Sequence, residues 1–134
     1  MFILDTNVIS GARRPERAPR LASWLEGRPE NELFISVISL GEIARGVRLQ
    51  ENKNPDFASD LGEWLKRTTD LFGDRVLPFS AEDALIWGRL SADIGNNGAD
   101  LMIAAIALAH GATVVTRNIS DFQPTNVKLL NPFE

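Results

Sequence analysis

The sequence predicts an α/β fold in which a parallel sheet of four to five strands is flanked by helices. Short apolar runs alternate along the chain with longer segments whose apolar residues have helical spacing. Such alternation is typical of a parallel sheet that is covered on both faces. The chain has 134 residues, of which 44% are hydrophobic, and no linker or repeat interrupts it. We therefore expect residues 1–134 to form a single domain with one core.

The first strand is expected where Phe2, Ile3 and Leu4 form an apolar run that stops abruptly at Asp5. A segment rich in Arg and Pro follows and is expected to be a loop. Further on, Ser36 or Ser39 can cap the helix that comes after the second strand. The first half should thus contain a strand at 2–4, a loop at 11–19, a helix at 20–26, a strand at 33–35 and a helix that ends near residue 50.

The second half continues the alternation. Ser80 and Asp83 have the spacing of a capping box, with Asp in place of the usual Glu. Residues 99–110 are apolar nearly all round, so this helix should be buried, and Gly111 is a natural terminator. The expected elements are a helix at 56–72, a strand at 76–77, a helix that starts after residue 80, a loop at 95–98, a helix at 99–110, and strands at 113–116 and 127–130.

Composition excludes several classes of function. The chain has no cysteine and one histidine, His110, so thiolate or multi-histidine metal sites and Ser-His-Asp hydrolysis are poor candidates. The net charge of −4 argues against a general coat for nucleic acid. Neither a signal peptide nor a membrane-spanning run is evident, and we expect a cytoplasmic protein without a membrane partner.

Polar side chains gather where the expected strands end and the following helices begin. Asp5 ends the first strand, Glu42 lies one turn into the helix after the second, and Asp100 begins the buried helix. Asn118 and Asp121 follow the fourth strand. These positions face one rim of a parallel sheet, where unpaired carboxylates would repel one another. Mg²⁺ or Mn²⁺ would remove that penalty, because hard cations prefer oxygen ligands.

Each of these residues also has a structural explanation. Asp5 can cap a turn, Glu42 can be a solvated helix residue, and Asp100 can complement a helix dipole. Asn118 and Asp121 can be turn residues. The spacing of these residues along the sequence does not decide between these structural roles and a metal site.

Two other functions remain open from the residues themselves. Asp5 can be the nucleophile of an aspartyl-phosphate phosphotransferase. Such enzymes usually have a second Asp two residues on as general acid, and Asn7 stands there. The other alternative is a catalytically inactive module that binds RNA or protein. That alternative predicts that Asp5→Asn, Glu42→Gln and Asp100→Asn leave function untouched.

Four segments and the chain end resemble those of PIN-domain toxins of the VapC and FitB kind. The resemblance extends from residue 1 to residue 132 and includes Asn131-Pro132 near the end. No single motif decides it, but this order of motifs across the chain is specific. The segments are LDTN at 4–7, SLGEIARG at 39–46, ADLMIAA at 99–105, and TRN at 116–118 with Asp121-Phe122.

The resemblance implies a PIN-like three-layer fold and Mg²⁺- or Mn²⁺-dependent endoribonuclease activity, the toxin half of a type II toxin–antitoxin system. It further implies a cognate antitoxin and a homodimer. Asp5, Glu42 and Asp100 match the family's catalytic, metal-binding acids. The fourth acidic position is Asp in some relatives and is Asn118 here, for which Asp121 can substitute.

In such a mechanism a metal-activated water hydrolyses an RNA phosphodiester, without a catalytic histidine. Thr6 and Asn7 would orient Asp5 or a ligand water. Thr116 can act likewise, although a β-branched strand residue is its simpler explanation. Four arginines are expected to hold RNA phosphates if they are not merely solvated: Arg13, Arg14, Arg45 and Arg48.

Overall fold

A computed structural model describes all residues, 1–134, and contains one parallel sheet with the strand order β3-β2-β1-β4-β5. The predicted α/β class and the upper strand number are confirmed. β1 lies at the centre and pairs with β2 on one side and β4 on the other. The strands are β1 (Phe2–Leu4), β2 (Leu33–Ser36), β3 (Val76–Leu77), β4 (Thr113–Val115) and β5 (Lys128–Leu130).

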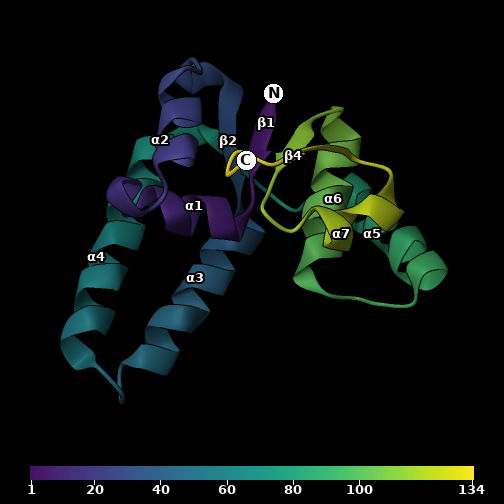
Figure 1. Cartoon of the computed structure of the whole chain (residues 1–134). Coiled ribbons are helices and arrows are strands. Elements are labelled where there is room, and N and C mark those ends of the chain that lie inside the picture. The colour runs from purple at the N-terminus through teal and green to yellow at the C-terminus, as the bar shows by residue number, and fades with distance from the viewer.

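Seven helices flank the sheet in two groups (Figure 1). The first four lie on one side, where α3 and α4 form a hairpin that extends away from the sheet. The last three lie on the other side. The helices are α1 (Thr6–Ala12), α2 (Pro19–Glu26), α3 (Val37–Gln50), α4 (Pro55–Phe72), α5 (Ala81–Ile94), α6 (Ala99–His110) and α7 (Ile119–Phe122). None of them combines the length and apolarity that crossing a membrane requires.

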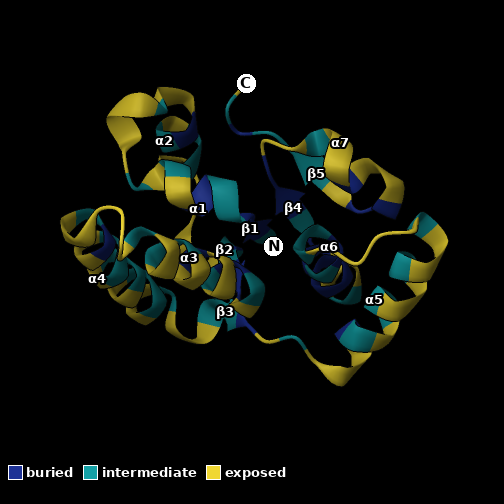
Figure 2. Cartoon of the chain, turned by 90° about the horizontal axis from the view of Figure 1, so that it is seen from below, coloured by how far each residue is buried: buried dark blue, intermediate teal, exposed yellow.

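Alternation along the strands divides the core into two clusters, one on each face of the sheet. Ile3 and Val114 belong to the cluster beneath α5, α6 and α7, whereas Leu4 and Val115 belong to the cluster beneath the first four helices. Successive residues of a strand point to opposite faces, so each strand serves both clusters. Figure 2 shows the buried residues in the sheet and on the inner sides of the helices.

Local signals place several helices as predicted. The Ser36 hydroxyl caps α3 by accepting from the Ser39 amide at 3.2 Å. Ser80 and Asp83 form the full capping box of α5. Gly111 ends α6 in a left-handed conformation with φ of +63°, which glycine adopts without a Cβ clash. α6 is buried along most of its length, as its composition predicted.

Two expectations about local structure are wrong. Residues 11–19 are not one loop: α1 continues to Ala12, a 3₁₀ turn spans Pro15–Arg17, and Pro19 begins α2. Neither α1 nor α7 was predicted. Both α1 and α7 are too short to show a helical period, so burial of Val8, Ile9 and Phe122 against the sheet must hold them.

Candidate active site

The carboxyl ends of β1 and β4 bring Asp5 and Thr116 together. Asp5 comes directly after β1 and is buried. Thr116 follows β4 and donates from Oγ1 to Asp5 Oδ2 at 2.7 Å. Asp5 also caps α1, since its Oδ1 accepts from the Thr6 amide at 2.8 Å. Asp5 is therefore a helix cap, as one of the explanations from sequence expects. A cap does not need to be buried, however, nor to accept a hydrogen bond from a residue that follows another strand.

Asn7 joins the two strand ends. Its Nδ2 donates to Asp5 Oδ2 at 3.1 Å and lies 3.3 Å from Thr116 Oγ1. Its Oδ1 accepts from the Arg117 amide at 3.1 Å. Asn7 and Thr116 thus fix the orientation of the Asp5 carboxylate, as expected for groups that position a ligand.

Thr6 connects Asp5 to α3. Its hydroxyl donates to Glu42 Oε1 at 2.6 Å and lies 2.8 Å from Ser39 Oγ. Since a hydroxyl has one hydrogen, Ser39 can be the donor of the second bond. Ser39 is fully buried and was not predicted as a site residue. Its position three residues before Glu42, on the same helix face, was the available signal.

Asp100, at the second position of α6, experiences the charges of the other acids. Burial is the largest cause that raises the pKa of Asp100 to about 6, followed by repulsion from Asp5, Asp121 and Glu42. Burial also raises the pKa of Asp5, with Glu42 adding to it, against the lowering by the Thr116, Thr6 and Asn7 hydrogen bonds. None of these acids has a salt bridge, because the chain's one ion pair joins Arg48 to Glu51.

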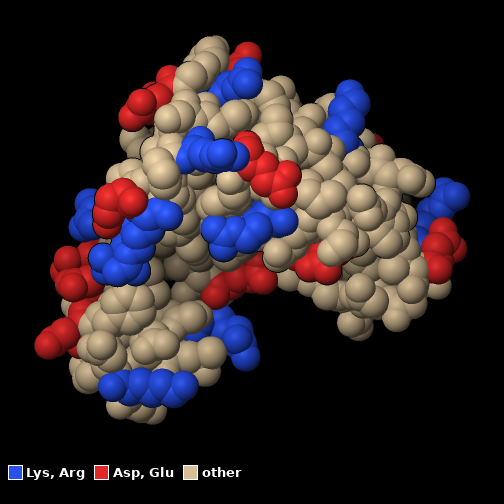
Figure 3. All heavy atoms as spheres, in the orientation of Figure 1, with Lys and Arg blue, Asp and Glu red and all other residues tan.

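The acids are close enough to repel one another, but the expected convergence is incomplete. No three acidic or histidine side chains stand close enough together to hold an ion in the arrangement of this structure. Asp5 is fixed by hydrogen bonds, whereas Glu42 and Asp121 are exposed at the rim. Figure 3 shows acidic side chains gathered near the start of α1, with basic side chains beside them.

The remaining predicted residues lie further from these contacts. Asn118 is exposed, and only its backbone is engaged: its amide donates to Thr116 Oγ1 at 2.9 Å, and its carbonyl accepts from the Asp121 amide at 3.2 Å. Arg13 stacks on the Phe57 ring at 5.2 Å, and with Arg14 it lines a separate pocket beside α4. Arg45 is exposed on α3. Arg48 is held by Glu51 at the far end of the hairpin.

These acids destabilise the fold when they are charged, which predicts a pH dependence. Asp100 holds its proton up to a pH of about 6 in the folded chain but only to about 3.8 when unfolded. The folded state therefore binds more protons between these values, and stability falls as the pH rises through them. Urea unfolding in EDTA from pH 4 to pH 8 should show this fall, and Asp100→Asn should reduce it. Equal pH profiles for both proteins would contradict the repulsion.

Comparison with known proteins agrees with this geometry. The model of the PIN domain family matches residues 2–123. The chain belongs to the PIN-domain family. It is 34% identical to toxin FitB of Neisseria gonorrhoeae over 99% of both chains. It is 32% identical to the VapC ribonuclease Y4jK of Sinorhizobium fredii, over 100% of this chain and 99% of that one.

Solved structures share the fold of this PIN domain. The crystal structure of FitAcB from Neisseria gonorrhoeae superposes with a TM-score of 0.86 and 34% identity, covering 100% of this chain and 99% of the other. VapBC2 from Rickettsia felis, crystallised with a DNA fragment from its promoter, superposes with a TM-score of 0.73 and 28% identity, covering 97% of both. The PIN-like arrangement of sheet and helices is therefore confirmed.

Proposed function

We propose that this PIN domain is the ribonuclease toxin of a toxin–antitoxin pair. The observation that carries the proposal is the set of unneutralised carboxylates around buried Asp5 and half-buried Asp100. The VapC ribonuclease and the FitB toxin, relatives over their whole length, support it. In this proposal residues 1–134 act as one domain in the cytoplasm. RNA is the substrate, and a cognate antitoxin inhibits the ribonuclease activity.

The residues fit Mg²⁺ or Mn²⁺ in their chemistry. All candidate ligands are oxygen atoms, which these hard cations prefer. The mutual repulsion that raises the pKa of Asp100 is also the penalty that a cation would remove. Asp5 and Asp100 would hold the ion with Glu42, and Asp121, whose charge raises the pKa of Asp100, is a further candidate together with the exposed Asn118. Rotation of the exposed Glu42 would complete the set.

A bound dication would lower the pKa of a water molecule toward neutrality and neutralise charge on the phosphodiester. The chain's own residues supply the positioning. Thr116 and Asn7 hold the Asp5 carboxylate, and Thr6 holds Glu42. The bonds to Asp5 link the ends of β1 and β4, so a rigid scaffold orients that acid, whereas Glu42 would exchange its bond with Thr6 for the ion. No histidine takes part, since His110 lies at the opposite end of α6 from Asp100.

Cleavage of a mixed RNA pool by the purified chain tests the proposal. We expect RNA cleavage with Mn²⁺ or Mg²⁺, its loss in EDTA, and recovery when the metal is restored. Cleavage that continues in EDTA, or an intact pool with either metal, would contradict the proposal. Aspartyl-phosphate chemistry predicts instead that a beryllium fluoride mimic binds Asp5.

Thr116→Val should reveal how far the Asp5 orientation matters. Valine has the same shape but leaves Asp5 Oδ2 with Asn7 Nδ2 as its one remaining donor and the Asn118 amide without its acceptor. We expect a loss of about 1–3 kcal/mol in the free energy of unfolding and a loss of about 10–100-fold in activity or metal affinity. Thr116→Ser keeps the hydroxyl and should retain most of both. Full activity of Thr116→Val would remove Thr116 from the positioning role.

A further inference from the structure

Arg117 is an exposed arginine at the rim of the candidate active site. It follows Thr116, whose hydroxyl donates to Asp5, and its backbone amide donates to Asn7 Oδ1 at 3.1 Å. Its position in the chain is therefore fixed by the same bonds that orient Asp5. Its guanidinium, however, forms no ion pair with any acid, because the chain's one salt bridge joins other residues.

The ring of Phe133 holds this guanidinium instead. The central carbon of the Arg117 guanidinium lies 3.9 Å from the centroid of the Phe133 ring. The other contacts between arginines and rings in this chain are longer, at 4.7–5.5 Å. A cation over the face of an aromatic ring is attracted by the electrons of the ring. Stacking on Phe133 therefore restricts the orientations that the long side chain of Arg117 can adopt.

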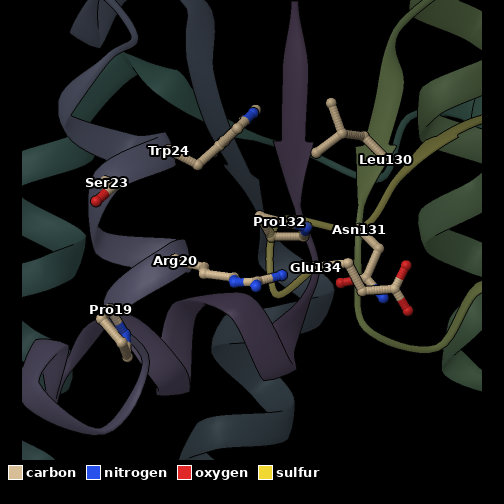
Figure 4. Close-up of a pocket in the computed structure, with 8 residues that line it drawn as sticks. All are labelled: Pro19, Arg20, Ser23, Trp24, Leu130, Asn131, Pro132 and Glu134. Atoms are coloured by element: carbon tan, nitrogen blue, oxygen red, sulfur yellow. The ribbon is translucent and has the colours of Figure 1, made fainter.

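Phe133 is itself fixed by α1 and by the turn after β5. A Cβ atom at Gly11 would lie 3.3 Å from Phe133 Cζ, so the ring packs on α1 where that helix has no side chain. Asn131 Oδ1 accepts from the Phe133 amide at 2.9 Å. Figure 4 shows this segment across a pocket from α2, where Arg20 points toward Pro132. The ring is thus part of the packed structure rather than a loose chain end.

The contact with α1 also places the guanidinium relative to the acids. Gly11 lies near the end of α1, whereas Asp5 caps its start. Six residues of helix separate them by about 9 Å along the axis. Arg117, which stacks on the ring beside Gly11, therefore lies beside the acids rather than among them.

Stacking leaves the hydrogen-bond donors of Arg117 available. The ring occupies a face of the planar guanidinium, whereas its five N–H groups point outward in the plane. Pairs of these groups match two oxygen atoms of a phosphate or a carboxylate. No carboxylate of the chain takes them, not even that of Glu134 next to Phe133. These donors are therefore open to an anion from solution.

We propose that Arg117, positioned by Phe133, binds a backbone phosphate of RNA that flanks the scissile one. The proposal rests on the proposed ribonuclease function. RNA carries a negative charge on every phosphate, which the net charge of −4 and the acids of the site would repel. A fixed cation beside the acids offsets this repulsion and holds the strand in register. Because contacts to phosphates carry no sequence information, Arg117 should position RNA without selecting bases.

Arg117→Gln is expected to raise KM for RNA by about 10-fold, with little change in kcat. Glutamine removes the charge and with it the charge-assisted hydrogen bonds to a phosphate. A contact that is equal in the bound substrate and the transition state affects KM rather than kcat. Arg117→Lys keeps the charge without the planar fork, so it should recover only part of the loss.

Arg28→Gln is the matched control. Arg28 is also exposed and stacks on a ring, that of Trp24 at 5.2 Å. It also lies over Phe2, at the other end of β1 from Asp5. Its KM should equal that of the wild type. A wild-type KM in Arg117→Gln, or a loss confined to kcat, would show that the phosphate inference is wrong while the ribonuclease function stands.

Phe133→Leu tests the positioning role of the ring. Leucine keeps an apolar contact with Gly11 but offers no aromatic face to a cation. We expect KM to rise by less than in Arg117→Gln. In the double variant, Phe133→Leu should raise KM no further, because residues that act as a unit are not additive. Independent effects that multiply in the double variant would contradict the pairing of Phe133 with Arg117.

Binding of RNA without cleavage separates this inference from the ribonuclease function. The Asp100→Asn chain in EDTA is a suitable host, because one repelling charge is gone and no metal is present. Fluorescence anisotropy of a labelled single-stranded RNA gives its binding constant at several salt concentrations. One phosphate contact contributes about 0.7 to the slope of log K against log salt, so Arg117→Gln should reduce the magnitude of the slope by about this amount.

Each outcome of the binding measurement decides the inference. An unchanged slope in Arg117→Gln, or no RNA binding by the host chain at low salt, would overturn it. A reduced slope, in a chain whose wild type cuts no RNA with Mn²⁺, would retain the phosphate contact of Arg117 and overturn the ribonuclease function.

Discussion

Asp5→Asn is expected to lower RNA cleavage by about 100-fold or more, while the chain remains folded. Asparagine matches aspartate in shape, so its Oδ1 can still accept from the Thr6 amide while its Nδ2 donates to the hydroxyl oxygen of Thr116. It removes the negative charge from the most deeply buried acid of the site. Loss of that charge weakens both the hold on a dication and the activation of water.

The initial rate of cleavage of a labelled RNA at saturating Mn²⁺ measures this loss. Asp56→Asn is a suitable control, because Asp56 is an exposed acid in the first turn of α4 and takes no part in the site. It should cleave at the wild-type rate. Wild-type activity of Asp5→Asn would favour a module whose acids are only structural.

Mg²⁺ or Mn²⁺ is expected to raise the melting temperature by an amount that grows with pH. Only the folded chain gathers the acids, so a bound ion stabilises the folded state. At a metal concentration 100-fold above Kd the gain is about 2.7 kcal/mol, which corresponds to a shift on the order of 10 °C in a chain of this size. Below pH 6 the proton on Asp100 competes with the metal, so the shift should shrink.

Thermal unfolding at pH 5 and pH 8, with Mg²⁺ or EDTA, checks this expectation. Asp100→Asn should melt higher than the wild type in EDTA at pH 8, because the repulsion is gone, and should gain less from Mg²⁺. A metal shift that is equal at both pH values, or unchanged in Asp100→Asn, would contradict the role of Asp100.

The central strands and longer helices could be predicted from the sequence because their signals are local. The apolar run that stops at Asp5 indicates where a strand ends, and the capping box at Ser80 indicates where a helix begins. α1 and α7 have no such signal, because tertiary contacts of Val8, Ile9 and Phe122 decide their structure. Short helices held by packing leave no periodic pattern to recognise.

The candidate site was predictable in its acids but not in its connections. Strand ends in a parallel sheet share a rim, which brought Asp5 and Thr116 together as expected. The bond network that runs through Ser39 and Asn7 depends on side-chain orientations that no spacing shows. Local contacts of the arginines were equally hidden, since Arg48 pairs with Glu51 and Arg13 stacks on Phe57, and their role in RNA binding stays a prediction.

The most direct test of the account is the position of Mn²⁺ in crystals of this chain, located by anomalous X-ray scattering. We expect one peak at the carboxyl ends of β1 and β4, with oxygen atoms of Asp5 and Asp100 at about 2.0–2.3 Å from it. The side chain of Glu42 should have turned toward the ion. A Mn²⁺ ion bound elsewhere under conditions that support cleavage, with these carboxylates still apart, would contradict the account.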